Sequence, residues 1–160
     1  LKKNKLSKID YYFSKYKNLE FIFDRPKMIN LKGIISRNRK NYSFRENKWP
    51  LFPPQSCISV KRKTIQKNIG KLFKKKFPLT TLDFRIAALS DQFRDNTFFL
   101  ENELTYYFQH DDNESNKNFS LFNSNWFKRR LEGFDYYETV NKKKIRSLDY
   151  YFTRIANIFF

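Results

Sequence analysis

The 160-residue chain contains very little glycine, histidine and cysteine, with three, one and one residues respectively. Gly33, Gly70 and Gly133 lie too far apart to form a glycine-rich loop that cradles a phosphate. The single cysteine, Cys57, excludes an internal disulfide framework. Because His110 is the only histidine, the ligand set of a structural zinc site is missing as well. These absences exclude a disulfide scaffold, a zinc-stabilised domain and a phosphate-binding loop of the usual kind.

Two arrangements of residues could still carry chemistry, and each has a simpler explanation. Cys57 and His110 could act as a nucleophile and its base, but a packed cysteine and a histidine in a polar loop are far more common. Asp111, Asp112 and Glu114 could hold Mg²⁺ or Ca²⁺, although their spacing does not match a calcium-binding loop. We therefore expect no catalytic residues, no metal site and no cofactor.

Long apolar runs are absent too. No stretch approaches the roughly eighteen consecutive apolar residues of a membrane-spanning helix, so we expect no membrane span. Residues 1–5 are Leu-Lys-Lys-Asn-Lys and lack the apolar region of a secretory signal. They also lack the arginine and serine that are typical of a mitochondrial transit peptide, which favours a protein made in the compartment where it works.

Positive charge, by contrast, is abundant and concentrated in one part of the chain. The formal net charge is +17, and residues 36–77 carry thirteen lysines and arginines against one acid, Glu46. Residues 78–114 carry a net negative charge, and the acidic region over residues 83–114 is expected to face solvent or a basic neighbouring protein. Solubility alone does not require so much charge of one sign in one segment, so the sequence predicts a polyanionic partner.

The first part of this basic segment predicts an extended chain. We expect a single domain over residues 1–160, because this length suits one hydrophobic core. Within it, residues 36–60 form a long basic segment without sustained periodicity, and Pro50, Pro53 and Pro54 oppose regular structure there. A further strand is an alternative over residues 55–60, at its end. Such a polar segment often becomes ordered only against a partner.

The second part, over residues 64–77, has the period of a helix. Its apolar residues recur at i, i+4, i+7 and i+8 and share one face: Ile65, Ile69, Leu72 and Phe73. The lysines of the segment share the opposite face: Lys63, Lys67, Lys71 and Lys74. Pro78 is expected to end this helix. A lysine-rich face is usually just solvated, but the adjoining basic segment favours binding of an anion.

The remaining elements alternate between helix and strand. A first helix is expected to begin at Ser7, followed by strands over residues 19–23 and 28–35 that are joined by a turn at Pro26. A further helix is predicted after Thr80, with Leu82, Ile86, Leu89 and Phe93 facing the core. Residues 97–109 fit either a helix or a hairpin that turns at residues 101–103, and the helix is favoured.

Two helices are predicted near the C-terminus. The first covers residues 126–132, is capped by Ser124 or Asn125 and ends at Gly133. The second has the clearest periodicity of the chain, and its apolar residues share one face: Leu148, Tyr151, Phe152, Ile155 and Phe159. Together these elements predict an α+β fold, a small helix-rich domain with a long basic extended segment.

Cations that neutralise phosphates and aromatic rings on which bases stack are the usual elements of an RNA-binding surface. In the extended segment the predicted RNA-binding residues are Arg37, Arg39, Lys40, Tyr42, Phe44, Arg45, Lys48 and Trp49. In and before the basic helix they are Lys61, Arg62, Lys63, Lys67, Lys71, Lys74 and Lys75. Two C-terminal clusters add Lys128, Arg129, Arg130, Lys142, Lys143 and Lys144.

The overall composition suggests a family resemblance. Lysine, asparagine, phenylalanine, isoleucine and tyrosine are abundant, whereas alanine and valine are scarce and lysine outnumbers arginine two to one. A/T-rich codons encode the abundant residues, and in this respect the short, basic chain resembles ribosomal proteins encoded by A/T-rich mitochondrial genomes. The resemblance implies a structural rRNA-binding protein of the mitochondrial matrix, with rRNA and neighbouring ribosomal proteins as partners.

Two other functions remain open. The chain could be a matrix-side accessory subunit of a respiratory-chain or ATP synthase membrane complex, in which clusters such as residues 142–146 meet anionic lipid headgroups. An RNA-processing enzyme is the less favoured alternative, because no catalytic constellation is evident.

Overall fold

The computed structural model describes residues 3–30, 32–33, 35–37, 42–44, 48–108 and 124–159. Helices and strands are mixed along the chain, which confirms the predicted α+β fold. The strands are β1 (Phe21–Ile29), β2 (Ile35–Arg37), β3 (Ile58–Val60) and β4 (Thr97–Phe108). The helices are α1 (Lys5–Lys15), η1 (Gln55–Cys57), α2 (Arg62–Lys67), α3 (Ile69–Leu72), α4 (Leu82–Ser90), η2 (Asp91–Asn96), α6 (Ser124–Asn141) and α7 (Leu148–Phe159).

β1 is the central strand of a four-stranded sheet. β4 lies parallel to it along its whole length, from the pair Phe21 and Thr97 to the pair Ile29 and Phe108. β3 and β2 are antiparallel to the beginning and the end of β1 respectively. Because a strand has only two edges, β2 and β3 share the edge that β4 leaves open. At the start of β1, successive side chains enter different cores, Phe21 on one face of the sheet and Ile22 on the other, so this part of the strand is buried on both faces.

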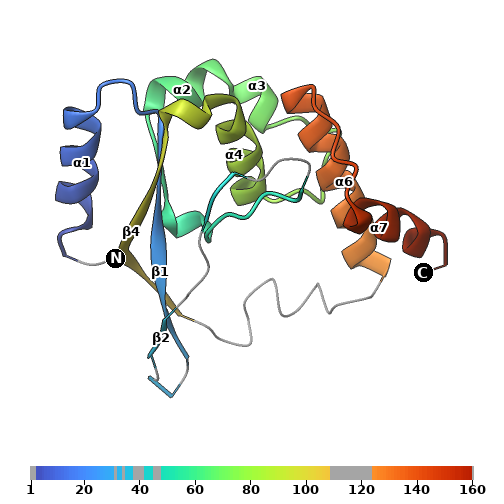
Figure 1. Ribbon diagram of the computed structural model, residues 1–160, viewed down its shortest axis with the longest axis horizontal. Helices are drawn as coiled ribbons and strands as arrows, with labels where there is room; N and C mark the ends of the chain where they lie inside the picture. Colours follow the sequence, from blue (N-terminus) through green and yellow to red (C-terminus); the bar gives the residue numbers. More distant parts are fainter. Residues whose placement is uncertain are drawn as a thin grey trace.

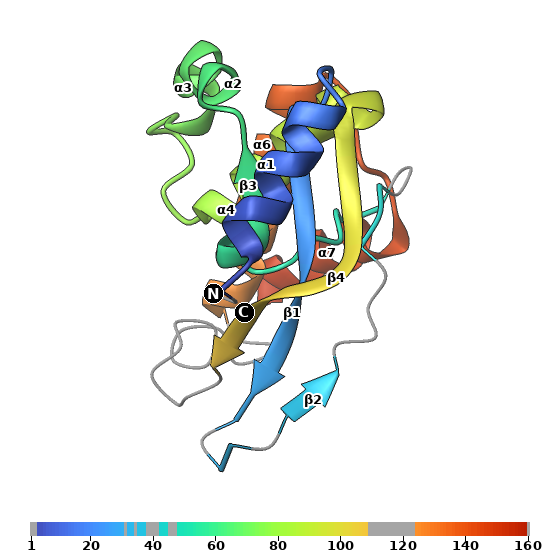
Figure 2. The same ribbon diagram turned by 90° about the vertical axis from the view of Figure 1, so that its left-hand side faces the viewer.

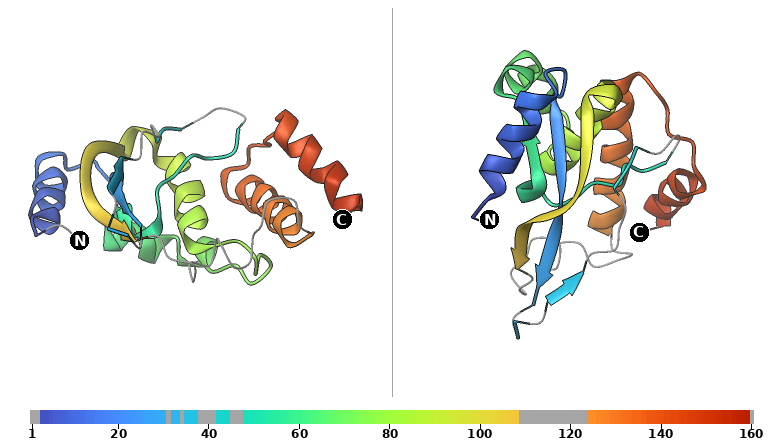
Figure 3. Two further views of the ribbon diagram at one scale, coloured as in Figure 1. Left: turned by 90° about the horizontal axis from the view of Figure 1, so that it is seen from below. Right: turned by 60° about the vertical axis from the view of Figure 1, so that its left-hand side comes forward.

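Helices cover both faces of the sheet (Figure 1). α1 lies on one face, α4 and then α6 lie on the other, and α7 packs outside α6. Figure 3 shows the same layers from two further directions. The core under α1 contains Ile9, Leu19, Ile22, Leu100 and Leu104. The larger core on the other face includes Phe21, Leu72, Phe77, Phe84, Leu89, Phe134, Tyr136 and Val140.

The N-terminal strand prediction is wrong. Strands over residues 19–23 and 28–35 with a turn at Pro26 were expected, but β1 continues through Pro26 as one strand from Phe21 to Ile29, and Ile35 begins β2. Pro26 is accommodated because the register between β1 and β4 shifts on both sides of Arg25, and proline is accepted at such bulges. The chain turns only after β1, where Gly33 has a φ of +71° and its N–H donates to the carbonyl of Asn30. The ends of β1 and β4 and the short β2 extend beyond the helices as an arm (Figure 2).

The prediction for residues 97–109 is also wrong, both as a helix and as a hairpin. β4 is a continuous strand of twelve residues, and residue 109 lies outside the described part of the chain. Leu100 and Leu104 both lie in the core under α1. A spacing of four residues places side chains on the same side of a helix and also on the same side of a strand. The apolar pattern therefore could not distinguish the two structures.

The predicted basic helix is broken into two short helices. α2 ends at Lys67 and α3 begins at Ile69, and between them the Asn68 side chain donates to the carbonyl of Thr64. α3 ends at Leu72, well before Pro78. Leu72 is buried as expected, but Ile69 and Phe73 are 55% and 60% exposed. Only part of the predicted apolar face therefore packs into the core.

Helix boundaries differ elsewhere for identifiable reasons. α1 begins at Lys5 rather than Ser7. The helix after Thr80 is confirmed as α4, but Thr80 does not cap it, since its N–H and hydroxyl both bond to Glu132 at 2.7 Å. α6 continues through Gly133 to Asn141. A Cβ at Gly133 would lie 2.5 Å from Cη2 of Trp49, so this glycine gives space to an indole and does not end the helix.

α7 is confirmed as a helix, but its apolar face points outward. Leu148 and Phe159 are 90% and 79% exposed, whereas the side that packs on α6 buries Thr153 and Ala156. The periodicity predicted the helix correctly but not the direction of its apolar face. None of the helices in the described part of the chain combines the length and hydropathy that crossing a bilayer requires.

A buried ion pair ties α1 to the sheet. The Lys5 ammonium donates to Asp24 Oδ1 at 2.7 Å, to the Ser56 carbonyl at 2.7 Å and to Thr105 Oγ1 at 2.6 Å. The Thr105 hydroxyl donates to the second oxygen of Asp24 at 2.7 Å. Lys5 and Asp24 are 4% and 0% exposed, so all three ammonium hydrogens and both carboxylate oxygens have partners inside the protein. α1, β1, η1 and β4 meet at this cluster.

Replacing Lys5 by methionine should strongly destabilise the protein. Asp24 would remain buried without its cation, and loss of one partner of a buried pair costs about 3–5 kcal/mol of unfolding free energy. Chemical denaturation followed by circular dichroism measures this loss. Lys8→Met is the matched control, because Lys8 lies on the same helix and is only partly buried. Equal stability of the two variants would contradict the role given to Lys5.

Cys57 makes the stability of the protein sensitive to alkaline pH. It is buried beside this cluster, and burial, together with the negative charge of Asp24, raises the pKa of its thiol to about 11. The pKa of an unfolded thiol is about 8.5. Because the pKa of the thiol is higher in the folded protein than in the unfolded chain, the neutral thiol contributes its full stabilisation below about pH 8.5. As the pH rises to about 11, the free energy of unfolding falls by about 3 kcal/mol. Denaturation at both pH values should show a smaller loss for Cys57→Ala, and identical losses would refute the assignment.

Candidate nucleic-acid interface

The largest group of described cations lies on α2, on α3 and on the loop that follows. This lysine surface consists of Arg62, Lys63, Lys67, Lys71, Lys74, Lys75 and Lys76. All of these side chains are exposed except Lys71, which is half-buried and donates to Gln92 at 2.9 Å. Within the described part of the chain none of the seven forms an ion pair. The surface therefore keeps its full positive charge.

A cavity of about 510 Å³ opens at the start of this surface. It is lined by Glu20, Lys61, Arg62, Lys63, Thr64, Lys67, Asn68 and Phe93. Glu20 is the one acid among these lining residues, and it accepts a hydrogen bond from Thr64 and lies 4.0 Å from Lys61. Lys61 also donates to the carbonyl of Lys17 at 2.6 Å. Arg62, Lys63 and Lys67 are therefore the cations of this cavity that an anion can reach.

Arg85 of α4 holds the loop that carries the last three lysines. Its guanidinium donates to four backbone carbonyls, at distances of 2.9 Å to Thr80, 2.5 Å to Leu72 and 3.3 Å to Lys74, and also to Phe77. The Tyr136 ring lies 5.4 Å from the guanidinium carbon. A planar fork of five donors suits this task, and lysine could not reproduce it. Arg85 is thus a positioning residue for the lysine surface.

The three aromatic residues predicted to stack on RNA have partners within the protein. Tyr42 is only 9% exposed. The Phe44 ring packs edge-on against Phe99 at 5.2 Å. The Trp49 ring stacks on Phe84 at 4.5 Å, and Arg130 lies 4.3 Å from its centroid. These rings therefore support the fold of the segment instead of projecting from it.

Trp49 instead brings together predicted site residues that are far apart in the sequence. It lines a pocket of about 280 Å³ that we call the Trp–Arg pocket. The lining residues are Trp49, Phe52, Thr80, Thr81, Phe84, Trp126, Arg129, Arg130 and Gly133. Residues 49–52, the N-terminal end of α4 and the first half of α6 thus meet here.

The other predicted residues are distributed as follows. Lys48, Lys128, Lys142, Lys143 and Lys144 are exposed, and Lys144 lies 3.5 Å from Glu138. Arg37 belongs to β2, where only the backbone is described. Arg39, Lys40 and Arg45 lie outside the described residues, as do His110, Asp111, Asp112 and Glu114. Among the described residues no three potential metal ligands gather closely enough to hold an ion.

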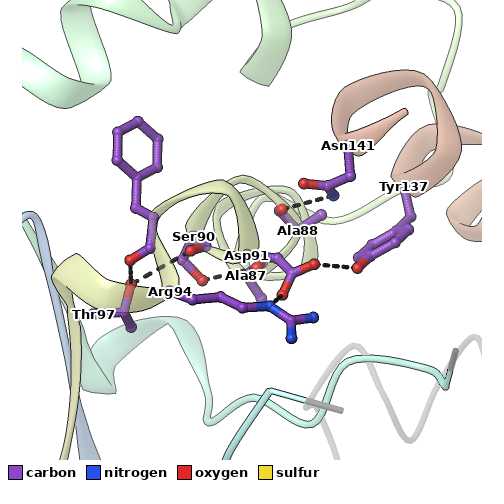
Figure 4. Close-up of polar contacts among 9 residues, drawn as sticks. Ala87, Ala88, Ser90, Asp91, Arg94, Thr97, Tyr137 and Asn141 are labelled. Carbon is purple, nitrogen blue, oxygen red and sulfur yellow. Dashed lines mark hydrogen bonds and ion pairs between the residues drawn. The ribbon is translucent and has the colours of Figure 1, made fainter. Parts of the chain in front are cut away.

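Polar groups between η2 and α6 satisfy one another and fix the helices behind the interface (Figure 4). Asp91 is 7% exposed, so this acid does not face solvent as the sequence predicted. It accepts hydrogen bonds from Tyr137 and, at 2.5 Å, from Nε of Arg94. Burial and the bond to Asp91 raise the pKa of Tyr137 well above its usual value. Asn141 adds a 2.9 Å bond to the carbonyl of Ala88. The cluster holds α6 against α4.

Sequence reasoning missed Arg85 and Thr81. Arg85 is the one cation in the otherwise apolar run Phe84 to Leu89 of α4, and a cation in such a place is the signal that could have revealed it. Thr81 carries no comparable signal, because its position beside Arg129 depends on the packing of α4 against α6.

Arg85→Lys should loosen the lysine-bearing loop without unfolding the domain. The ammonium keeps the charge but cannot bond to four carbonyls in one plane. Amide hydrogen exchange should therefore become faster over residues 72–80 while protection in β1 is unchanged. Arg94→Lys, which breaks a contact of η2, serves as the control and should leave residues 72–80 protected. Unchanged exchange in the loop of Arg85→Lys would refute the positioning role.

No protein-family model, no curated protein and no solved structure matches this chain.

Proposed function

We propose that the protein is a structural rRNA-binding protein of a mitochondrial ribosome and that it contacts RNA phosphates through the lysine surface. The observation that carries this proposal is the set of seven cations on that surface, none of which forms an ion pair with another described residue. Gathering like charges on two adjacent short helices is unfavourable unless a polyanion neutralises them. An RNA backbone is a polyanion with closely and regularly spaced charges.

The arrangement of the cations suits a backbone better than a single anion. Arg62, Lys63 and Lys67 line the 510 Å³ cavity, and Lys74, Lys75 and Lys76 continue the positive charge along the loop that Arg85 holds. A small anion would use only the three cations of the cavity, whereas the seven cations of the lysine surface are spread over α2, α3 and the loop after them. Recognition of this kind positions the protein on RNA without reading its sequence.

The assignment to a mitochondrial ribosome rests on composition. A chain rich in lysine, asparagine and phenylalanine, short and carrying a charge of +17, has the character of ribosomal proteins from A/T-rich mitochondrial genomes. Within a ribosome, the exposed Lys142 and Lys143 would face further RNA. The outward apolar face of α7 would contact a neighbouring protein.

A second candidate is a matrix-side accessory subunit of a respiratory-chain or ATP synthase complex. The observation that favours it is α7, where Leu148, Ile155 and Phe159 face outward next to the exposed Lys142 and Lys143. Apolar side chains flanked by lysines also suit the surface of an anionic membrane.

Binding to structured RNA should depend steeply on salt. If six to ten phosphates are contacted, affinity should fall by about 10³ to 10⁵ between roughly 50 and 200 mM salt. The double variant Lys63→Gln/Lys67→Gln should weaken binding and lower the slope of log affinity against log salt by about 2. Fluorescence anisotropy with a labelled rRNA fragment measures both effects.

The matched control is Lys3→Gln/Lys8→Gln, which removes the same charge at the N-terminal end of α1 and should leave the slope nearly unchanged. Affinity that barely responds to salt would count against RNA binding. Flotation with anionic vesicles and no measurable binding to RNA would favour the membrane-complex alternative.

A further inference from the structure

Another cavity lies beside the lysine surface, at the end of the sheet where α1 leads into β1 and η2 leads into β4 (Figure 1). Its volume is about 390 Å³, within the roughly 300–1,000 Å³ of sites that enclose small ligands. We call it the Tyr–Phe cavity. It is lined by Tyr16, Lys17, Asn18, Leu19, Asp95 and Phe98, and the phosphate contacts proposed above use none of these residues.

Aromatic rings from α1 and β4 form one side of the Tyr–Phe cavity. Tyr12 and Tyr16 lie one helical turn apart, and their stacked rings have centroids 6.4 Å apart. The Phe98 ring packs against both, at 5.4 Å from Tyr12 and 6.2 Å from Tyr16. These contacts leave part of each ring open, because Tyr16 and Phe98 are 45% and 38% exposed. Open ring surface in a cavity of this size suits an unstacked base.

Two lysines place positive charge next to these rings. The Lys17 side chain lines the cavity, is exposed and forms no ion pair within the described part of the chain. The Lys15 ammonium lies 5.4 Å from the Tyr16 centroid and donates to the Tyr11 hydroxyl at 3.2 Å. A nucleotide whose base enters the cavity can therefore bring its phosphate to a cation.

Asp95 is the one acid among the lining residues. Its carboxylate is exposed and forms no hydrogen bond or ion pair with any other residue that the structure describes. On a surface that binds a polyanion, such a carboxylate lowers the affinity unless the ligand donates hydrogen bonds to it. Because an ionised carboxylate only accepts hydrogen bonds, the ligand that it favours must present donors.

Guanine is the base whose pairing edge matches a carboxylate. Its N1–H and its amino group lie side by side, so both can donate to one carboxylate. On adenine, cytosine and uracil an acceptor lies next to the donor on this edge, and the second carboxylate oxygen would face that acceptor. Pairing occupies the same edge, so this contact requires an unpaired base.

The Tyr–Phe cavity adjoins the 510 Å³ cavity of the lysine surface. Residues 17–20 separate the two, since residues 17–19 line the Tyr–Phe cavity and Glu20 lines the other. Lys61 lines the 510 Å³ cavity, and its ammonium donates to the Lys17 carbonyl at 2.6 Å. A strand whose phosphates lie on the lysine surface therefore has the Tyr–Phe cavity within reach of a neighbouring nucleotide.

We propose that the Tyr–Phe cavity binds an unpaired guanine of the RNA, with the base against Phe98 and Tyr16, its pairing edge at Asp95 and its phosphate at Lys17. This inference rests on the proposed RNA-binding function and adds to it a preference for one base. The lysine surface contacts phosphates of any sequence and supplies affinity, whereas the cavity selects the place on the RNA.

The test compares three labelled RNA duplexes that are identical except at one position. One duplex is fully paired, one has a single bulged guanine and one has a single bulged uracil. Fluorescence anisotropy at one fixed salt concentration gives the dissociation constant of each complex. The wild-type protein should bind the guanine bulge about 5- to 150-fold more tightly than the uracil bulge, which is the discrimination expected of one bidentate contact to a base.

Variants then assign the preference to the cavity. Asp95→Asn should abolish it, because the amide replaces one of the two acceptors by a donor. Asp10→Asn removes the same charge from an exposed position of α1 and should keep the preference. Phe98→Ala should weaken both bulged complexes and leave the paired duplex unchanged. The lysine-surface variant Lys63→Gln/Lys67→Gln should weaken all three complexes and keep the preference for guanine.

The outcomes separate this inference from the proposed function. Equal affinity of the wild-type protein for the two bulged duplexes overturns the cavity assignment while RNA binding stands. A preference for guanine that survives in Asp95→Asn shows that the base binds elsewhere and overturns it too. No measurable binding of any duplex at low salt overturns RNA binding itself. Asp95 is exposed and has no partner among the described residues, so its variant stays informative even if Phe98→Ala does not fold.

Discussion

The buried ammonium of Lys5 is the constraint on which the rest of the structure depends. A charged group inside a protein is tolerated only when all its hydrogen-bonding capacity is used, and here Asp24, Ser56 and Thr105 use it completely. These partners come from β1, η1 and β4, so the ion pair fixes how α1 lies on the sheet and where the segment before β3 meets it. It also explains why a strand can continue through Asp24 and Pro26: the carboxylate has a partner and the proline lies at a bulge.

α1 covers one face of the sheet. The helices packed on the other face therefore determine where the basic residues lie. α4 and α6 bury the large aromatic core. Polar side chains at the border of this core form contacts that hold the surface segments in place. Arg85 donates to four carbonyls at the end of α3 and in the lysine-bearing loop, and Arg130, which bonds to Asp149, lies against the rings of Trp49 and Trp126. Cations in this protein therefore have two kinds of role. Among the described residues, Lys5 is buried and fully bonded, whereas the seven cations of the lysine surface form no ion pair.

Several elements were predictable because their signal is local. The helices α4 and α7 follow from the spacing of apolar residues, and the lysine surface follows from a run of like charges. The failures have a common cause, which is that the deciding contact lies far away in the sequence. Leu100 and Leu104 suit a helix as well as a strand until β1 is placed beside them. Gly133 looks like a helix end until Trp49 is known to pack against it.

The sequence by itself determined that the protein is basic and that its cations gather in the middle of the chain, and it correctly predicted that helices and strands are mixed. Charge and periodicity are properties of neighbouring residues, so they need no knowledge of the fold. Only the tertiary structure decided which aromatic residues face inward, which cations keep their charge available, and that Trp49 meets Arg129 and Arg130 in one pocket. These outcomes depend on which elements pack together, and packing joins residues separated by up to a hundred positions, as Lys5 and Thr105 are.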